Sequence, residues 1–91
     1  MKSIKKSDFA KLLIEEAKKL NPDIRIGKAG LTEGMINEIK LQLKVKKLVK
    51  VKMLKPAFEE IGKKKLAMEI AEKTGGEIVQ QVGFVVVLWR R

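Results

Sequence analysis

The stretch "IRIGKAGLTEGMINEI", from Ile24 to Ile39, changes its hydrophobic pattern part of the way along. Ile24 and Ile26 flank a polar residue, which is typical of a short strand with one buried face. Beyond the glycines, the apolar residues recur at the spacing of one face of a helix. The stretch therefore predicts a strand over residues 24–26, a tight turn, and a helix that begins after Thr32.

Thr32 and Glu33 both suit the start of that helix. A threonine side chain in the capping position accepts a hydrogen bond from a backbone N–H of the first turn, and a glutamate in that turn complements the helix dipole. We expect the helix to end near Lys46 and to bury one apolar face, which is formed by Met35, Ile36, Ile39 and Leu43.

The hydrophobic pattern predicts further helices and strands before and after this strand–turn–helix segment. A helix over residues 8–20 is stopped by Asn21 and Pro22. The alternation in "KLVKVKML", residues 47–54, predicts a half-buried strand. Pro56 suits the first turn of a third helix, and Gly75 and Gly76 suit its left-handed end. The strings "EIVQQV" and "FVVVLWR" read as the two strands of a hairpin around Gly83.

These elements predict an α/β (α+β) fold in one domain, residues 1–91, with the order helix, strand, helix, strand, helix, strand, strand. Strands joined by a helix are expected to be parallel and the final hairpin antiparallel, which gives a small mixed four-stranded sheet with three helices. The last strand is apolar on both faces, so we expect it to be central. The helix over residues 8–20 would then cover part of the second face.

The charge of the chain indicates a polyanionic partner. Lysine and arginine number 21 against 11 acidic residues, so the formal net charge is +10. Part of this excess is concentrated in one acid-free stretch, and such clustering is typical of proteins that bind nucleic acid. The lysines of that stretch are Lys40, Lys44, Lys46, Lys47, Lys50, Lys52 and Lys55.

Cysteine and histidine are both absent from the sequence. Disulfides, thiolate or imidazole metal sites and the usual nucleophile–base pairs are therefore excluded. We predict a protein that is not an enzyme and that uses no cofactor and no metal. No apolar run reaches the length of a membrane span, so we expect no membrane partner and a soluble, cytoplasmic protein.

The glycine-bearing turn "GKAG", residues 27–30, lies between a strand and a helix. Backbone amides at such a place can approach a phosphate closely, and Lys28 adds a positive charge. Neither the phosphate loop of NTPases nor the dinucleotide fingerprint fits the glycine spacing. The GxxG pattern fits instead the loop with which KH-type modules clamp a nucleic-acid backbone. The alternative is that the glycines only satisfy the geometry of a tight turn.

Several other residues that could contact a ligand also have a structural interpretation. We read Phe9, Phe58 and Phe84 as core residues, and Trp89 as core rather than a base-stacking residue. Thr32 can be explained by capping the helix, as an alternative to contacting a nucleic acid. The lysines Lys50 and Lys52 are expected to face solvent or a ligand.

Three strings in the same order and spacing resemble one known family. They are "IGKAGLTEGMINEI", "LVKVKML" and "IAEKTGGEIVQQVGFVVVLWRR". Together they are similar to the CRM domain (chloroplast RNA splicing and ribosome maturation), whose stand-alone bacterial members are the YhbY proteins. The resemblance implies an RNA-binding fold similar to the C-terminal domain of translation initiation factor three. Bacterial relatives associate with precursors of the large ribosomal subunit, and plant relatives act in intron splicing.

The resemblance also implies which residues bind and which partner they bind. The implied partner is RNA, ribosomal or otherwise structured, with a pre-ribosomal particle as a further candidate partner. The segment "KPAFEEIGKKK", residues 55–65, matches the family loosely, so Lys63, Lys64 and Lys65 receive no role. The glycine loop and the lysine-rich flank form the predicted RNA-binding set: Gly27, Lys28, Ala29, Gly30, Thr32, Lys40, Lys44, Lys46 and Lys47.

Two other functions are compatible with the residues. A small basic chromatin-type protein would bind duplex DNA as tightly as RNA, without using the glycine loop. A protein-interaction module on ribosome assembly factors would use its apolar last strand as an interface and would bind independently of salt.

Overall fold

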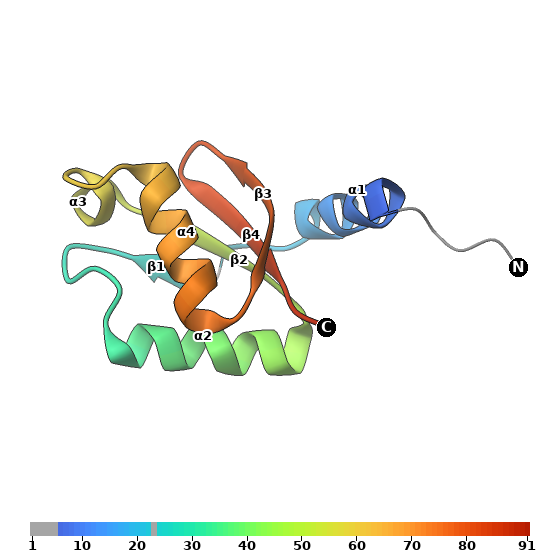
Figure 1. The fold of residues 1–91 in the computed structure, drawn as a ribbon, viewed down its shortest axis with the longest axis horizontal. Coiled ribbons are helices and arrows are strands. Elements are labelled where there is room, and N and C mark those ends of the chain that lie inside the picture. The colour runs from blue at the N-terminus through green and yellow to red at the C-terminus, as the bar shows by residue number, and fades with distance from the viewer. Residues whose placement is uncertain (1–5, 23) are drawn as a thin grey trace, which may run out of the picture.

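The computed structural model describes residues 6–22 and 24–91, which form one sheet and the helices packed on it (Figure 1). The helices of the described chain are α1 (Lys6–Lys18), α2 (Glu33–Lys46), α3 (Lys55–Phe58) and α4 (Lys63–Thr74). The strands are β1 (Ile24–Ile26), β2 (Leu48–Met53), β3 (Glu77–Val82) and β4 (Val85–Trp89).

The sheet has four strands in the order β1-β2-β4-β3. β1 pairs with β2 in parallel, with Ile24 opposite Val51, and β4 is antiparallel to both of its neighbours. The register of β3 on β4 shifts between Ile78 and Gln80. The predicted mixed sheet, the parallel β1–β2 pair and the central position of the last strand are therefore confirmed.

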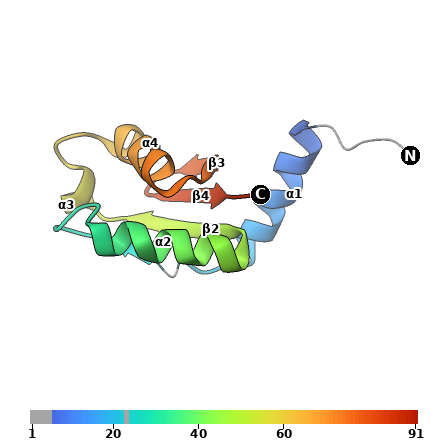
Figure 2. The same ribbon diagram turned by 60° about the horizontal axis from the view of Figure 1, so that its bottom comes forward.

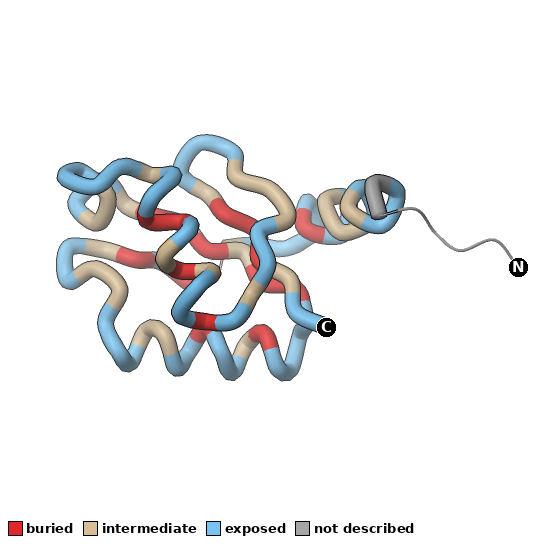
Figure 3. Tube along the Cα trace, viewed as in Figure 1, coloured by how far each residue is buried: buried red, intermediate tan, exposed pale blue. Residues whose placement is uncertain are grey.

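The main core lies on the sheet face that α2 and α4 cover. Ile39 and Leu43 of α2 are fully buried, as the predicted helix face requires. They pack with Leu66 and Ile70 of α4 against the strands, and Figure 3 shows buried segments on these helices and on the strands beneath them. The strand residues of this cluster are Ile24, Ile26, Val49, Val51, Met53, Val86 and Leu88.

Among the described residues, α1 covers the second face of the sheet, at one of its ends. Ala17 of α1 is buried with Leu48 and Val87, and Trp89 is partly buried beside them. Figure 2 shows α1 at the end of the sheet away from α3. Partial cover by this helix was expected, and Trp89 packs in the small core there as predicted.

The predicted third helix is in fact two helices, α3 and α4, because the chain turns sharply at Gly62. This glycine has φ +88°, which lies outside helical geometry and is costly for any residue with a Cβ atom. The Gly62 N–H donates to the Phe58 carbonyl at 2.7 Å and closes α3. α4 then ends at Gly75 with φ +77°, as predicted.

Three connections meet at one end of the sheet, which we call the loop end: residues 27–32, residues 54–62 with α3, and the turn at residues 83–84. The Leu54 N–H donates to the Ile26 carbonyl at 2.9 Å, and the Met53 N–H donates to the Phe84 carbonyl at 2.6 Å. Opposite this end lie α1 and the C-terminus of α2 (Figure 1). Within the described residues, no helix combines the length and apolarity that crossing a membrane requires.

Candidate nucleic-acid interface

The glycine loop is a short hydrogen-bonded turn that leads directly into α2. The Gly30 N–H donates to the Gly27 carbonyl at 2.9 Å, and the Thr32 N–H donates to the Gly30 carbonyl at 3.1 Å. Thr32 then caps α2, because its hydroxyl oxygen accepts from the Met35 N–H at 3.2 Å. The predicted cap is confirmed, and Lys28 and Ala29 are exposed at the tip of the turn.

The glycines of this region are not equally required by the fold. Gly30 has φ +74°, so a glycine there has a conformational reason. Gly27 has no positive φ, and an added Cβ atom would meet only the Leu54 side chain at an ordinary 3.8 Å. Gly34 lies in the first turn of α2, where a Cβ atom would meet nothing within 4 Å. A glycine inside a helix is less stable than an alanine at the same position. The fold therefore gives no structural reason for a glycine at Gly34.

Several backbone N–H groups at this site have no acceptor. The amides of residues 28, 29, 31, 33 and 34 donate to no other group in the described part of the chain. The first amides of any helix lack intrahelical acceptors, and together they carry about half a positive charge. Glycines without side chains at positions 27 and 34 leave these donors open to a bulky anion such as a phosphate group.

The lysines of α2 do not form one continuous track with this loop. α2 has 14 residues and is therefore about 21 Å long. Lys40 lies past its middle, and Lys44 and Lys46 lie in its last turn, at the end away from the glycine loop. The structure thus brings together Gly27, Lys28, Ala29, Gly30 and Thr32, and places the other predicted lysines further along the helix.

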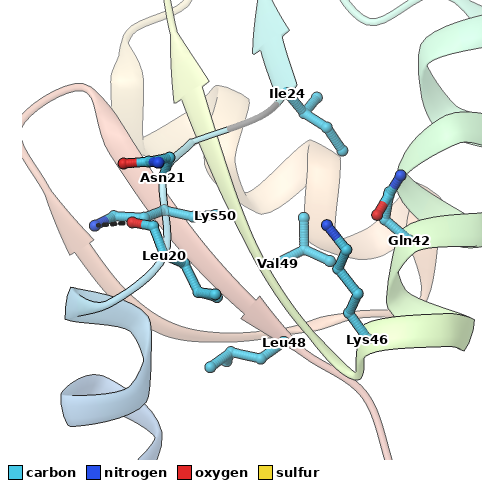
Figure 4. A pocket seen from close by; sticks show the side chains of 8 residues that line it. All are labelled: Leu20, Asn21, Ile24, Gln42, Lys46, Leu48, Val49 and Lys50. Atoms are coloured by element: carbon cyan, nitrogen blue, oxygen red, sulfur yellow. Dashed lines mark hydrogen bonds between the residues drawn. The ribbon is translucent and has the colours of Figure 1, made fainter.

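These lysines also point to different sides of α2. Six positions separate Lys40 from Lys46, which corresponds to about 120° around a helix. Lys40 lies beside the C-terminus of α4, in a surface depression that it shares with Lys73 and Arg90. Lys46 lines a hollow between α2 and the β1–β2 edge, facing Ile24 (Figure 4).

Lys47 serves a structural purpose at the end of α2. It has φ +68° and closes the helix, with its N–H donating to the Leu43 carbonyl at 2.9 Å. Its carbonyl accepts from the Arg90 N–H at 2.9 Å, and its Nζ lies 3.4 Å from the Arg91 carbonyl oxygen. The side chain of Lys47 is exposed, so the capping role does not hide its charge.

Lys50 differs from its predicted position. We expected it to face solvent or a ligand, but it is half-buried and donates to the Ala17 carbonyl at 3.2 Å and to the Leu20 carbonyl at 3.4 Å. A cation at these carbonyls satisfies the C-terminus of α1 and complements its dipole (Figure 4). Lys50 therefore fastens α1 to the sheet. Lys52, also half-buried, lies between Arg25 of β1 and Val85 of β4.

The interpretation of the phenylalanines as core residues was wrong for two of them. The exposed fraction is 51% for Phe84 and 37% for Phe9, while Phe58 is half-buried at the edge of the main core. Phe9 contacts the Trp89 ring edge-on at a centroid distance of 4.9 Å. Phe84 is stacked on Phe58 at the loop end. Both rings lie at the surface against another aromatic ring, and the buried residues of the main core are aliphatic or methionine.

Comparison with known proteins identifies the family. The family model of the CRS1/YhbY (CRM) domain matches residues 6–90 of this chain. The chain belongs to this family. The CRM relationship thus covers α1, the glycine loop and the final hairpin alike.

Several CRM relatives have names that refer to RNA. The chain is 36% identical over 80 residues to a probable RNA-binding protein of Methanocaldococcus jannaschii, covering 88% of this chain and 59% of the relative. It is 36% identical over 88 residues to an RNA-binding protein of Haemophilus influenzae, covering 97% of this chain and 84% of that protein. The chain therefore spans less than two thirds of the archaeal relative and most of the bacterial one.

A solved structure confirms the CRM fold. It is the solution structure of a Staphylococcus aureus protein thought to bind RNA, with a TM-score of 0.73 and 35% identity. The alignment covers 90% of this chain and 83% of the other. Helices, strands and the glycine loop therefore occur here in a CRM arrangement.

Two features of this CRM surface were missed from the sequence. Gly34 was recognised as part of a signature but was not assigned to the binding set, although its missing Cβ opens the start of α2. The pairing of Phe58 with Phe84 joins residues far apart in the chain, so no local pattern reveals it. The sequence did contain an indication for Gly34. A glycine in the first turn of a helix lowers stability, so its presence there indicates a role other than helix formation.

Proposed function

We propose that this protein binds RNA and that the loop Gly27–Gly30, with the first turn of α2, holds the sugar-phosphate backbone. One observation supports this most strongly: amides without an acceptor belong to exposed residues of the loop and the first turn of α2, next to Gly27 and Gly34, and the backbone geometry requires neither of these glycines. Membership of the CRM family and the RNA-binding names of relatives support RNA as the polyanion.

In the proposed mechanism, backbone and side chains play different parts. The amides at the start of α2 hold a phosphate in a fixed geometry, and Lys28 adds a mobile charge beside it. Further along α2, Lys40 and Lys44 attract the neighbouring phosphates of the same RNA. The function is binding without a catalytic step, and we place it in the cytoplasm.

The identity of the RNA is a finer part of the proposal. Bacterial YhbY proteins, which this chain resembles, associate with precursors of the large ribosomal subunit. We therefore propose a role in maturation of the large ribosomal subunit or in another RNA-processing event. Crosslinking in cells, followed by sequencing of the attached RNA, tests this role: enrichment of ribosomal RNA precursors is expected, and a random RNA population would contradict it.

A carboxylate placed in the glycine loop tests the binding mechanism. The Gly27→Glu variant has room for its Cβ atom, so it should fold, and its negative charge should repel a phosphate. We expect the affinity for a fluorescent structured RNA to fall by about tenfold or more, in line with the loss of one or more charge-assisted contacts. The matched control is Leu12→Glu, which adds the same charge at an exposed position of α1 away from the loop end.

Three outcomes separate this proposal from its rivals. Equal losses in both variants would show that only net charge matters and would overturn the loop mechanism. Equal affinity for duplex DNA, unchanged by Gly27→Glu, would favour a chromatin-type protein. Finally, about three to six phosphate contacts with single-stranded RNA predict a slope of about −2 to −4 in a plot of log affinity against log salt. A flat plot would favour a protein-interaction module.

A further inference from the structure

An exposed aromatic pair lies at the loop end. The rings of Phe58, at the end of α3, and Phe84, just before β4, have centroids 5.6 Å apart and planes inclined by 18°, so they are stacked. Phe84 is 51% exposed, which leaves a large apolar ring surface in contact with water. A surface aromatic ring that is held in place by a second ring is pre-ordered and therefore loses little entropy when it binds a flat partner.

The side-chain ammonium of Lys63 lies against this aromatic pair. The Nζ atom of Lys63 is 4.9 Å from the Phe84 centroid and 5.9 Å from the Phe58 centroid. Phe84 is 51% exposed with both neighbours in place, so part of its ring surface stays open to solvent. We call the face of the Phe84 ring that points away from Phe58 its outer face.

The aromatic pair is a close neighbour of the glycine loop. The Phe84 carbonyl accepts from Met53, and the next residue, Leu54, donates to Ile26, which immediately precedes the loop. Two strand spacings, about 10 Å, therefore separate the backbone at Phe84 from the backbone at Ile26. Leu31 of the loop and Phe58 of α3 pack at the edge of the same core, and α3 lies beside the loop in Figures 1 and 2.

We propose that the outer face of Phe84, supported by Phe58 and Lys63, stacks one unpaired base of the RNA whose backbone is held at the glycine loop. A base offers the flat π surface that an exposed phenylalanine matches, and its phosphates offer the negative charge that the surrounding lysines match. Lys55, Lys63, Lys64 and Lys65 outnumber the glutamates of the same segment, Glu59 and Glu60. An apolar protein partner would leave these charges without counter-charges.

This inference rests on the proposed RNA binding and makes it more specific. It predicts that the bound RNA contains at least one unstacked nucleotide, as found in a loop, a bulge or a single strand. A fully paired helix would engage only the glycine loop and the lysines. The aromatic pair would then account for a preference for single-stranded over perfectly paired RNA.

The test compares two phenylalanine variants on two RNA probes. Phe84→Leu keeps the site apolar but removes the ring, and Phe9→Leu makes the same change at the partly exposed Phe9 of α1. The probes are a fluorescein-labelled single-stranded RNA octamer of mixed sequence and the same octamer without bases. We expect Phe84→Leu to weaken the normal octamer by about five- to hundredfold, and to leave the abasic octamer unchanged. Phe9→Leu should change neither, and the salt dependence should not change in either variant.

Crosslinking provides an independent measurement on the unmodified protein. An octamer that contains 5-iodouridine should crosslink on irradiation to the peptide that carries Phe84, as mass spectrometry would show. Equal weakening of both probes by Phe84→Leu, or no weakening of either, would overturn the stacking site. If Gly27→Glu still abolished binding in that case, the proposed function would stand. If Gly27→Glu had no effect while Phe84→Leu did, the loop mechanism would fail and stacking alone would remain.

Discussion

The two ends of helix α2 both carry positive charge at the surface, but they present it in different ways. At the start, backbone N–H groups are unpaired, and glycines at 27 and 34 keep side chains away from them. At the end, the Lys47 N–H donates to the Leu43 carbonyl in a closed cap, and the charge belongs to the lysine side chains.

If the protein binds RNA as proposed, this difference would give two kinds of contact with one RNA. Fixed amides recognise the shape of a phosphate and lose little entropy on binding, whereas lysine side chains are mobile point charges that respond to salt. We therefore expect the start of α2 to position the RNA and its end to increase affinity without positioning it. The following predictions test this division, beginning with the largest expected effect.

Ile39 supports both ends of α2 and should have the largest effect on stability. The side chain is fully buried in the main core, so Ile39→Ala should lower the free energy of unfolding by about 2–5 kcal/mol. Urea unfolding measures this loss. Leu41→Ala, on the exposed side of the same helix, is the control and should change stability by less than about 0.5 kcal/mol. Similar losses in the two variants would show that α2 is not anchored through Ile39.

Gly30 and Lys47 give a matched pair, because both have positive φ and they lie at opposite ends of α2. Gly30→Ala forces a Cβ atom into a left-handed conformation and should cost about 1–2 kcal/mol. Lys47→Gly relieves that conformation and should stabilise the protein by about 0.5–1 kcal/mol. Thermal unfolding of both variants measures the contrast. Shifts of the same sign would contradict the backbone geometry at one of the two ends.

Gly34→Ala should separate stability from binding. The added methyl group has free space and improves the helix, so stability should rise by about 0.5 kcal/mol. The same methyl group lies where a phosphate would approach, so RNA affinity should fall a few-fold. Asn37→Ala, one turn further along α2, is the control and should stabilise without weakening binding. A Gly34→Ala protein with unchanged affinity would show that the RNA does not approach the start of α2 closely.

Much of the fold could be predicted because each signal was local. Thr32 marked the start of α2, the alternation around Val49 marked β2, and an apolar run marked β4 as central. The split between α3 and α4 was not predicted, because the hydrophobic spacing continues across Gly62. Whether a glycine interrupts a helix or only weakens it depends on the backbone conformation that the surrounding packing imposes, and here φ is +88°.

For the candidate site, the loop was predictable and its surroundings were not. The pattern of residues 27–30 and the cap at Thr32 identified the position of the exposed amides. Helical periodicity showed that lysines are frequent on α2, but Lys40 and Lys46 lie on different sides of it, beside different neighbours. Lys50 and Lys52 alternate in the same way on the predicted strand, so no local pattern showed that the Lys50 amine binds the end of α1.

By itself, the sequence determined the order of the elements, the position of the glycine turn before α2 and the excess of positive charge. These properties depend on residue type and on the spacing of residues that are close together along the chain. Only the tertiary structure decided that Phe84 stacks on Phe58 beside that turn, and that Lys50 fastens α1. Contacts between residues so distant in the chain follow from sheet order and strand register, which bring Phe84 next to Met53 and leave its ring in the solvent.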